Sequence, residues 1–211
     1  MCFGLPLQKI QMDLEKVYDF VERMCVKYCI DESHDVSHSK DCVYFATELM
    51  PIKVSEDVRT VILFAAAVHD TVDKKYTSFE AVNEVREFFQ SIHLPTPLIN
   101  AIVDIITTMS YSFLVSRRKE SLSFPDHGEW DEAYHIVRNA DLLCSFRVKR
   151  CFQYQKHLTP EISDNEAMKK VADLFRTRVF AYEINGWLTI EKARSLSTSL
   201  RKKALEDLIL I

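Results

Sequence analysis

The stretch SEDVRTVILFAAAVHD, residues 55–70, carries the pattern that decides the fold class. Ser55 is a residue type that caps helix N-termini, and the two acidic residues after it stand where the helix dipole favours negative charge. Apolar residues then recur every three or four positions, which predicts a helix with one buried face. His69 lies on that buried stripe, and Asp70 ends the helix.

Similar periodicity covers most of the remaining chain. We expect capping boxes at Thr77 with Glu80 and at Ser163 with Glu166 to start two of the helices, and a long surface loop over residues 110–128. No alternating run is long enough to predict a strand. The expected helices span about residues 7–30, 38–49, 55–70, 77–92, 96–109, 129–157, 163–185 and 189–211.

The prediction is therefore an all-α fold of about eight helices in a single domain, residues 1–211. Its core covers about residues 12–185, and the C-terminal helix, residues 189–211, packs on that core. The composition agrees with this prediction, because 47% apolar and 27% charged residues in a chain of 211 are typical of one globular domain.

The composition also excludes or disfavours several classes of protein. The three glycines lie too far apart to form the phosphate-binding loop of a P-loop or Rossmann protein, and the net charge of −4 disfavours a nucleic-acid partner. The longest apolar run, residues 61–68, is far shorter than the ~20 residues of a membrane span, so we expect no membrane partner. The six cysteines form no CxxC pair, and we interpret them as reduced, mostly buried thiols of a cytoplasmic protein, in the host cytoplasm if the chain is viral.

Ionisable residues interrupt the apolar stripes of three predicted helices. His38, His69 and Asp141 each occupy a position that should be buried, and Asp70 directly follows His69. Each of them alone has a simpler explanation, such as a hydrogen-bonded core histidine or an aspartate paired with a nearby arginine. Together, two imidazoles and two carboxylates could converge on one cation and leave room for water. That mixed nitrogen and oxygen set suits Mn, Fe, Ni or Mg better than a closed tetrahedral zinc site.

The three segments that contain these residues occur in an order that resembles a known family. They are SHDVSH at 33–38, AAAVHD at 65–70 and NAD at 139–141. The pattern is similar to that of the HD-domain metal-dependent phosphohydrolase superfamily, in which a His, an adjacent His-Asp pair and a distant Asp lie on an all-helical fold. The resemblance covers about residues 12–185. It implies one divalent metal ion, with Mn²⁺ favoured and Fe, Ni, Mg and Zn left open, held by His38, His69, Asp70 and Asp141.

A finer resemblance points to small single-domain members of this superfamily. His34 and His38 form an HDxxH pattern, and Ser110-Tyr111-Ser112 is similar to a Ser-aromatic-Ser segment of small bacterial and viral HD proteins. The implied function is hydrolysis of a nucleotide or a related phosphate ester or anhydride, as in a nucleotide pyrophosphohydrolase or a nucleotidase. The implied reaction is attack of a metal-bound water on phosphorus.

The segment HDTVDK, residues 69–74, resembles the HDTVED segment of guanosine tetraphosphate hydrolases. By that resemblance Asp73 positions or deprotonates the attacking water. Lys74 stands where the second acidic residue would be, which puts that specific substrate in doubt. We expect Lys74 and Lys75 to contact phosphate oxygens, unless they are simply a solvated pair at a helix end. His34 could stabilise developing charge or protonate the leaving oxygen, unless it only begins a helix.

Three residues near the predicted loop complete the expected site. Tyr111 could stack on a nucleobase or simply pack, and Arg117 and Arg118 could steer a phosphate substrate or remain solvated. The expected partner is a small phosphate-containing molecule, with a nucleotide favoured by the resemblance.

The sequence departs from the family pattern after the last predicted metal ligand. Leu142-Leu143-Cys144 stands where the small HD proteins have Arg-Leu-Asp. Together with Lys74, this departure keeps a second hypothesis open, namely a regulatory or nucleotide-binding HD protein that retains the metal site without turnover. The sequence leaves the base, the bond and the oligomeric state open.

Overall fold

The computed structural model describes residues 7–209, and those residues form an all-helical fold without a β-strand. This confirms the predicted fold class. Cys2 and the last two residues of the predicted C-terminal helix lie outside the described residues. Ten α-helices and four short 3₁₀ segments follow one another in the order α1 (Leu7–Tyr28), η1 (Glu32–His34), α2 (Val36–Leu49), α3 (Glu56–Val68), η2 (His69–Val72), α4 (Glu80–Ser91), α5 (Thr96–Thr108), α6 (Tyr111–Lys119), η3 (Gly128–Trp130), α7 (Asp131–Cys144), α8 (Val148–Leu158), α9 (Asp164–Thr177), η4 (Val179–Ala181) and α10 (Glu191–Ile209).

Helix α3 forms the centre of the core. Ser55 caps it as predicted, since its side chain accepts a hydrogen bond from the backbone N–H of Val58. Every residue from 60 to 68 is buried, and α3 packs against α1, α2, α5 and α7. The helix is therefore apolar around most of its circumference, as expected for a helix covered on all sides.

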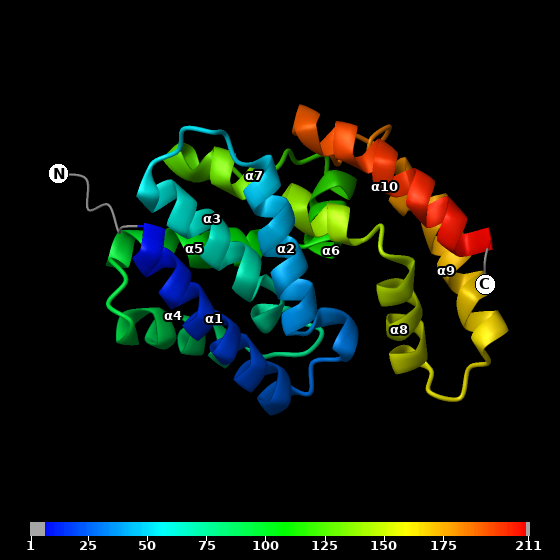
Figure 1. Ribbon diagram of the computed structural model, residues 1–211, viewed down its shortest axis with the longest axis horizontal. Helices are drawn as coiled ribbons and strands as arrows, with labels where there is room; N and C mark the ends of the chain where they lie inside the picture. Colours follow the sequence, from blue (N-terminus) through cyan, green and yellow to red (C-terminus); the bar gives the residue numbers. More distant parts are fainter. Residues whose placement is uncertain (1–6, 210–211) are drawn as a thin grey trace.

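The remaining helices extend this core toward the C-terminus. One continuous apolar cluster reaches from Ile10 in α1 to Ala204 in α10. Helices α8, α9 and α10 gather at one end of the long axis, and α1, α3, α4 and α5 lie at the other (Figure 1). Helix α10 contacts α7 and α8.

Two differences in the helix pattern raise the number of helices from eight to ten. The segment 110–128 was expected to be a loop, but α6 forms within it because Ser110 caps it and Leu114 is buried. The predicted helix 129–157 is wrong, because the chain turns between α7 and α8. Phe146 is buried at this turn. The backbone N–H groups of residues 145–147 bond three residues back, in the tighter 3₁₀ pattern.

Several predicted helix ends also need correction. Thr77 is not an N-cap, because its hydroxyl donates to the carbonyl of Asp73, and α4 begins only at Glu80. The Ser163 cap is confirmed by a hydrogen bond from the N–H of Glu166 to its hydroxyl. Helix α9 ends at Thr177, well before the predicted stop at 185.

The cysteines follow the predicted burial in part. Cys42, Cys144 and Cys151 are buried and reduced, and Cys25 is half-buried. Cys29 is exposed, because the chain leaves α1 there with a φ of 52°. No single helix among residues 7–209 has the length and apolar character needed to cross a membrane. Helices α5 and α6 together reach that length only as a pair bent by 67°.

Candidate metal centre

Three packed helices bring the predicted metal ligands to one place. His38 lies in the first turn of α2, Asp141 lies on α7, and His69 and Asp70 form the start of η2 directly after α3. Helix α2 begins at Val36 because the carboxylate of Asp35 accepts hydrogen bonds from the backbone N–H groups of the first turn. Since α2, α3 and α7 all pack against one another, these ends converge.

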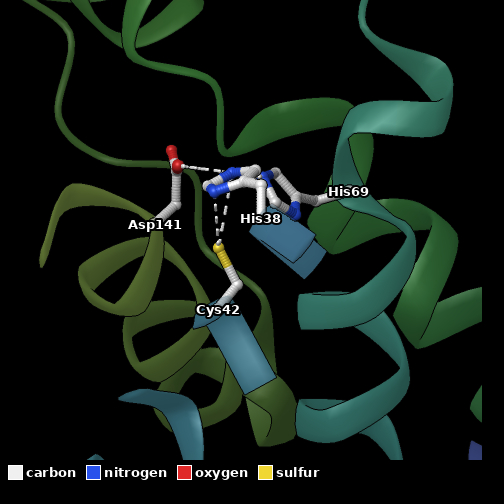
Figure 2. A group of neighbouring side chains, drawn as sticks. All are labelled: His38, Cys42, His69 and Asp141. Carbon is white, nitrogen blue, oxygen red and sulfur yellow. Dashed lines mark hydrogen bonds and ion pairs between the residues drawn. The ribbon is translucent and has the colours of Figure 1, made fainter. Parts of the chain in front are cut away.

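The ligand atoms surround a common point. The Nε2 atoms of His38 and His69 are 3.2 Å apart, and Asp70 Oδ2 lies 3.2 Å from the first and 3.3 Å from the second. Asp141 Oδ1 lies 3.5 and 3.7 Å from the same two nitrogens (Figure 2 shows both histidines with Asp141). Around an ion with bonds of about 2.1 Å, neighbouring ligand atoms are about 3.0 Å apart in an octahedron and about 3.4 Å apart in a tetrahedron. The observed distances therefore fit a single divalent ion.

Two further observations agree with ligation. Asp70 Oδ2 is buried and makes no well-directed hydrogen bond among the described residues, so its charge must be met either by the protonated imidazoles at ion-pair distance or by a metal ion. The Nδ1 atom of His69 lies 3.0 Å from the carbonyl oxygen of Ala66. A carbonyl only accepts, so this contact assigns the hydrogen to Nδ1 and, in the neutral ring, leaves the lone pair of Nε2 for a metal.

The charges of the four side chains are strongly coupled. Burial opposes protonation of His38 and so does Arg150, but the neighbouring carboxylates of Asp141 and Asp70 prevail and raise its pKa to about 9. Burial likewise opposes protonation of His69, but Asp70 and Asp141 raise its pKa well above the usual value. Burial disfavours the charged forms of the two carboxylates, yet the histidines hold both pKa values well below the ordinary range. The two ionised carboxylates therefore favour positive charge at the site, which protons on the histidines or a bound metal ion can supply.

Two thiols lie beside the ligands, and the sequence interpretation treated both only as core residues. Cys42 Sγ is 3.5 Å from His38 Nε2 and 3.4 Å from Cys144 Sγ. Ligand atoms of His38, Cys42, His69 and Asp141 all lie within 4.8 Å of one another, so this buried group could also hold a metal ion (Figure 2). Burial and the neighbouring Cys144 raise the pKa of the Cys42 thiol well above its usual value, which keeps it protonated.

His34 belongs to a hydrogen-bonded network next to the metal centre. Its ring centroid is 6.0 Å from that of His38, and its Nδ1 lies 3.0 Å from Asp31 Oδ2. Its Nε2 lies 2.9 Å from Lys75 Nζ, and the hydroxyl of Tyr76 donates to Asp31. Burial lowers the pKa of His34, so its ring is neutral near pH 7. Sequence reasoning missed Asp31 and Tyr76, which no motif marks.

The residues after His69-Asp70 are only partly engaged. Asp73 is half-buried, accepts a hydrogen bond from the N–H of Lys75 and lies 3.4 Å from its ammonium. Lys75 therefore joins Asp73 to His34. Lys74 is exposed and takes part in no hydrogen bond or ion pair with residues 7–209.

Helix α6 holds the other three predicted substrate-binding residues among aromatic side chains of the C-terminal segment. Tyr111 packs beside Tyr182 and Trp187. Arg118 stacks 3.5 Å above the Trp187 ring and donates to the carbonyl of Asn185. Arg117 donates to the carbonyl of Ser123. Within the described part of the chain, Tyr111, Arg117 and Arg118 make no hydrogen bond, ion pair or ring contact with His34 or the four ligands. These contacts fasten α6 to the C-terminal segment.

Arg150 approaches the ligands from α8 and was also missed. Its Nε donates to the carbonyl of Ser33 at 2.5 Å, and its Nη2 lies 3.1 Å from His38 Nε2. On the predicted continuous helix, nine residues would turn Arg150 about 180° away from Asp141. The turn at 145–147 brings it back to the site.

Comparison of the chain with models of protein families, with curated proteins and with solved structures finds no match. The resemblance to HD-domain proteins therefore depends on the three motifs, their order and the convergence of their residues.

Proposed function

We propose that this protein is a metal-dependent phosphohydrolase that acts on a nucleotide or a related phosphate ester or anhydride. The observation that carries the proposal is the convergence of His38, His69, Asp70 and Asp141 around one point, where the buried Asp70 Oδ2 makes ion-pair contacts with both imidazole Nε2 atoms but no well-directed hydrogen bond among the described residues. The order of these residues in the chain supports the same family of hydrolases.

The ion would be held by Nε2 of His38 and His69 and by carboxylate oxygens of Asp70 and Asp141. We favour Asp70 over Cys42 as the fourth ligand. The carboxylate is ionised, whereas the thiol is protonated and forms a hydrogen bond with Cys144. Two nitrogens and two oxygens favour Mn²⁺, with Fe, Ni, Mg and Zn as alternatives. When bound, such an ion supplies Lewis-acid activation of water and of a phosphoryl oxygen.

The neighbouring residues supply the proton transfers. Asp73, three residues after Asp70, would accept the proton of the attacking water. Asp31 fixes the hydrogen of His34 on Nδ1, so that Nε2 can accept one from Lys75. Lys75 and His34 together hold one transferable proton, which would go to the leaving oxygen. In this arrangement His34 acts through Lys75.

The experiment is a hydrolysis assay with nucleoside mono-, di- and triphosphates, guanosine tetraphosphate and cyclic nucleotides in the presence of Mn²⁺. We expect turnover that a chelator abolishes and that His69→Ala lacks. Asp73→Asn should lower the rate by about 10²–10⁴-fold, the usual contribution of a general base, while Mn²⁺ still binds. Unchanged turnover in His69→Ala would contradict the proposal.

A second function is a nucleotide-binding HD protein without turnover. Leu142-Leu143-Cys144 replaces the family's Arg-Leu-Asp, and the Cys42–Cys144 thiol pair lies directly against His38. Tight Mn²⁺ and nucleotide binding with no product in any assay would favour this function.

A further inference from the structure

Arg150 presents a half-buried positive charge to the metal centre. Helix α8 packs on the η1 turn, and this contact places the guanidinium between Ser33 and His38. The cation reaches the site from an element that lies outside the three family motifs.

The guanidinium has no carboxylate of its own. No Asp or Glu oxygen among residues 7–209 lies within ion-pair distance of Arg150, although the side chains of Asp70 and Asp141 act on it from farther away. Those two carboxylates are the ones that a bound metal ion would engage. With the metal in place, Arg150 would face the centre with an uncompensated charge, which is unfavourable for a cation that is partly removed from water.

The hydrogen-bonding capacity of Arg150 is also unfilled. A guanidinium offers five N–H donors in a planar fork. Within the described chain it donates to the carbonyl oxygen of Ser33, and its Nη2 lies 3.1 Å from His38 Nε2, whose lone pair the metal would take. The remaining donors match the oxygens of a phosphoryl group, for which arginine gives charge-assisted and often bidentate hydrogen bonds.

We propose that Arg150 binds phosphoryl oxygens of a phosphate ester or anhydride held at the metal centre. Lys75 contacts Nε2 of His34, and Arg150 contacts Nε2 of His38 and the carbonyl oxygen of Ser33, so both cations border the place where the anion would bind. The inference rests on the proposed function, since it requires a metal centre that takes a phosphate-containing ligand. It adds a residue and an element, α8, that the family pattern does not contain.

The competing explanation is that Arg150 only replaces the missing cation beside Asp70 and Asp141. Both explanations predict that removing Arg150 leaves metal binding intact or strengthens it, because a competing positive charge is lost. Only the proposed role predicts a loss of phosphate affinity.

The test measures binding of inorganic phosphate to the Mn²⁺-loaded full chain by titration calorimetry, with Mn²⁺ affinity measured separately. Arg150→Met should bind phosphate about 10- to 100-fold more weakly than the unmutated chain. Arg150→Lys, which keeps the charge but loses the fork, should fall between them. Arg147→Met is the matched control, because Arg147 is exposed at the start of the same helix and pairs with Asp41.

The outcomes separate this inference from the proposed function. Unchanged phosphate affinity in Arg150→Met, or an equal loss in Arg147→Met, overturns the role of Arg150. If Arg150→Met does not fold, as judged by circular dichroism, the comparison uses Arg150→Lys. If the unmutated chain binds no Mn²⁺, the proposed metal centre fails. In that case phosphate is titrated into the metal-free chain. Phosphate binding that Arg150→Met weakens would support the anion site, and the absence of phosphate binding would overturn it.

Discussion

Replacing Asp70 with Asn removes one of the two negative charges that face His38 and His69. The substitution keeps the shape of the side chain, and the amide oxygen can still occupy the position of Oδ2. That oxygen lies 3.2 and 3.3 Å from the two ring nitrogens and lacks a hydrogen-bond partner among the described residues. If Asp70 is a metal ligand, the main effect of Asp70→Asn is on metal binding.

The size of the effect follows from linkage. At a metal concentration of about 100 times Kd, binding stabilises the folded chain by about 2.7 kcal/mol. For a domain of this length that raises Tm by about 5–10 °C. Groups that only orient a metal ligand already cost about 10–100-fold in affinity when removed, so we take a loss of about 100-fold as the minimum for Asp70→Asn. At the same metal concentration the variant would then gain only about 0.4 kcal/mol, or about 1 °C.

The assay is a thermal melt of each protein with and without Mn²⁺, so that every variant is compared with its own metal-free form. Asp73→Asn is the matched control, because it makes the same chemical change three residues later on a carboxylate that is not expected to bind the ion. Its metal-dependent shift should equal that of the unmutated chain. A full shift in Asp70→Asn would refute the assignment of Asp70 as a ligand.

Three other predictions concern the same site and the core. The pKa of His38 is raised to about 9 and that of His69 is raised as well, so at neutral pH metal binding must displace these protons. Apparent Mn²⁺ affinity should therefore rise with pH and fall on acidification. Calorimetry in buffers of different ionisation enthalpy should show about two protons released per ion. Cys42→Ala should change Mn²⁺ affinity by less than about tenfold if Asp70 is the fourth ligand, whereas a loss of more than about 100-fold would favour the thiol. Phe64→Ala should lower the free energy of unfolding by about 3–5 kcal/mol in urea denaturation, because Phe64 is fully buried and stacks on Phe89; a loss below about 1 kcal/mol would contradict this packing.

The sequence was most informative where local signals agreed with tertiary burial. Helix α3 has an N-cap, an acidic first turn and an apolar run, and all three features appear in the structure. The four expected ligands were identifiable because an ionisable residue on an apolar stripe needs a partner, and the structure brings their side chains together.

The errors in the predicted helices arose where the apolar periodicity continued across a turn between two helices. Apolar residues keep a helical spacing through 145–147, so no local signal marks the turn between α7 and α8. The turn exists because Phe146 is buried there, which is a tertiary effect. The same error hid Arg150, since a continuous helix would place it on the face opposite Asp141.

The network around His34 was beyond sequence reasoning for a related reason. Tyr76 and Lys75 reach His34 only after η1 and the segment following η2 come together. Their separation of more than 40 residues carries no periodic signal. Tyr111 and Arg118, which the sequence suggested as substrate contacts, pack against Trp187, a contact that likewise follows no periodic signal.

The account depends most directly on one ion held by His38, His69, Asp70 and Asp141. Diffraction data from crystals grown with Mn²⁺, collected at the manganese absorption edge, would locate that ion. We predict one anomalous peak about 2.1–2.2 Å from a ligand atom of each of the four residues, with Cys42 Sγ outside bonding distance. A peak bonded to Cys42 in place of Asp70, or no peak between the two histidines, would contradict the account.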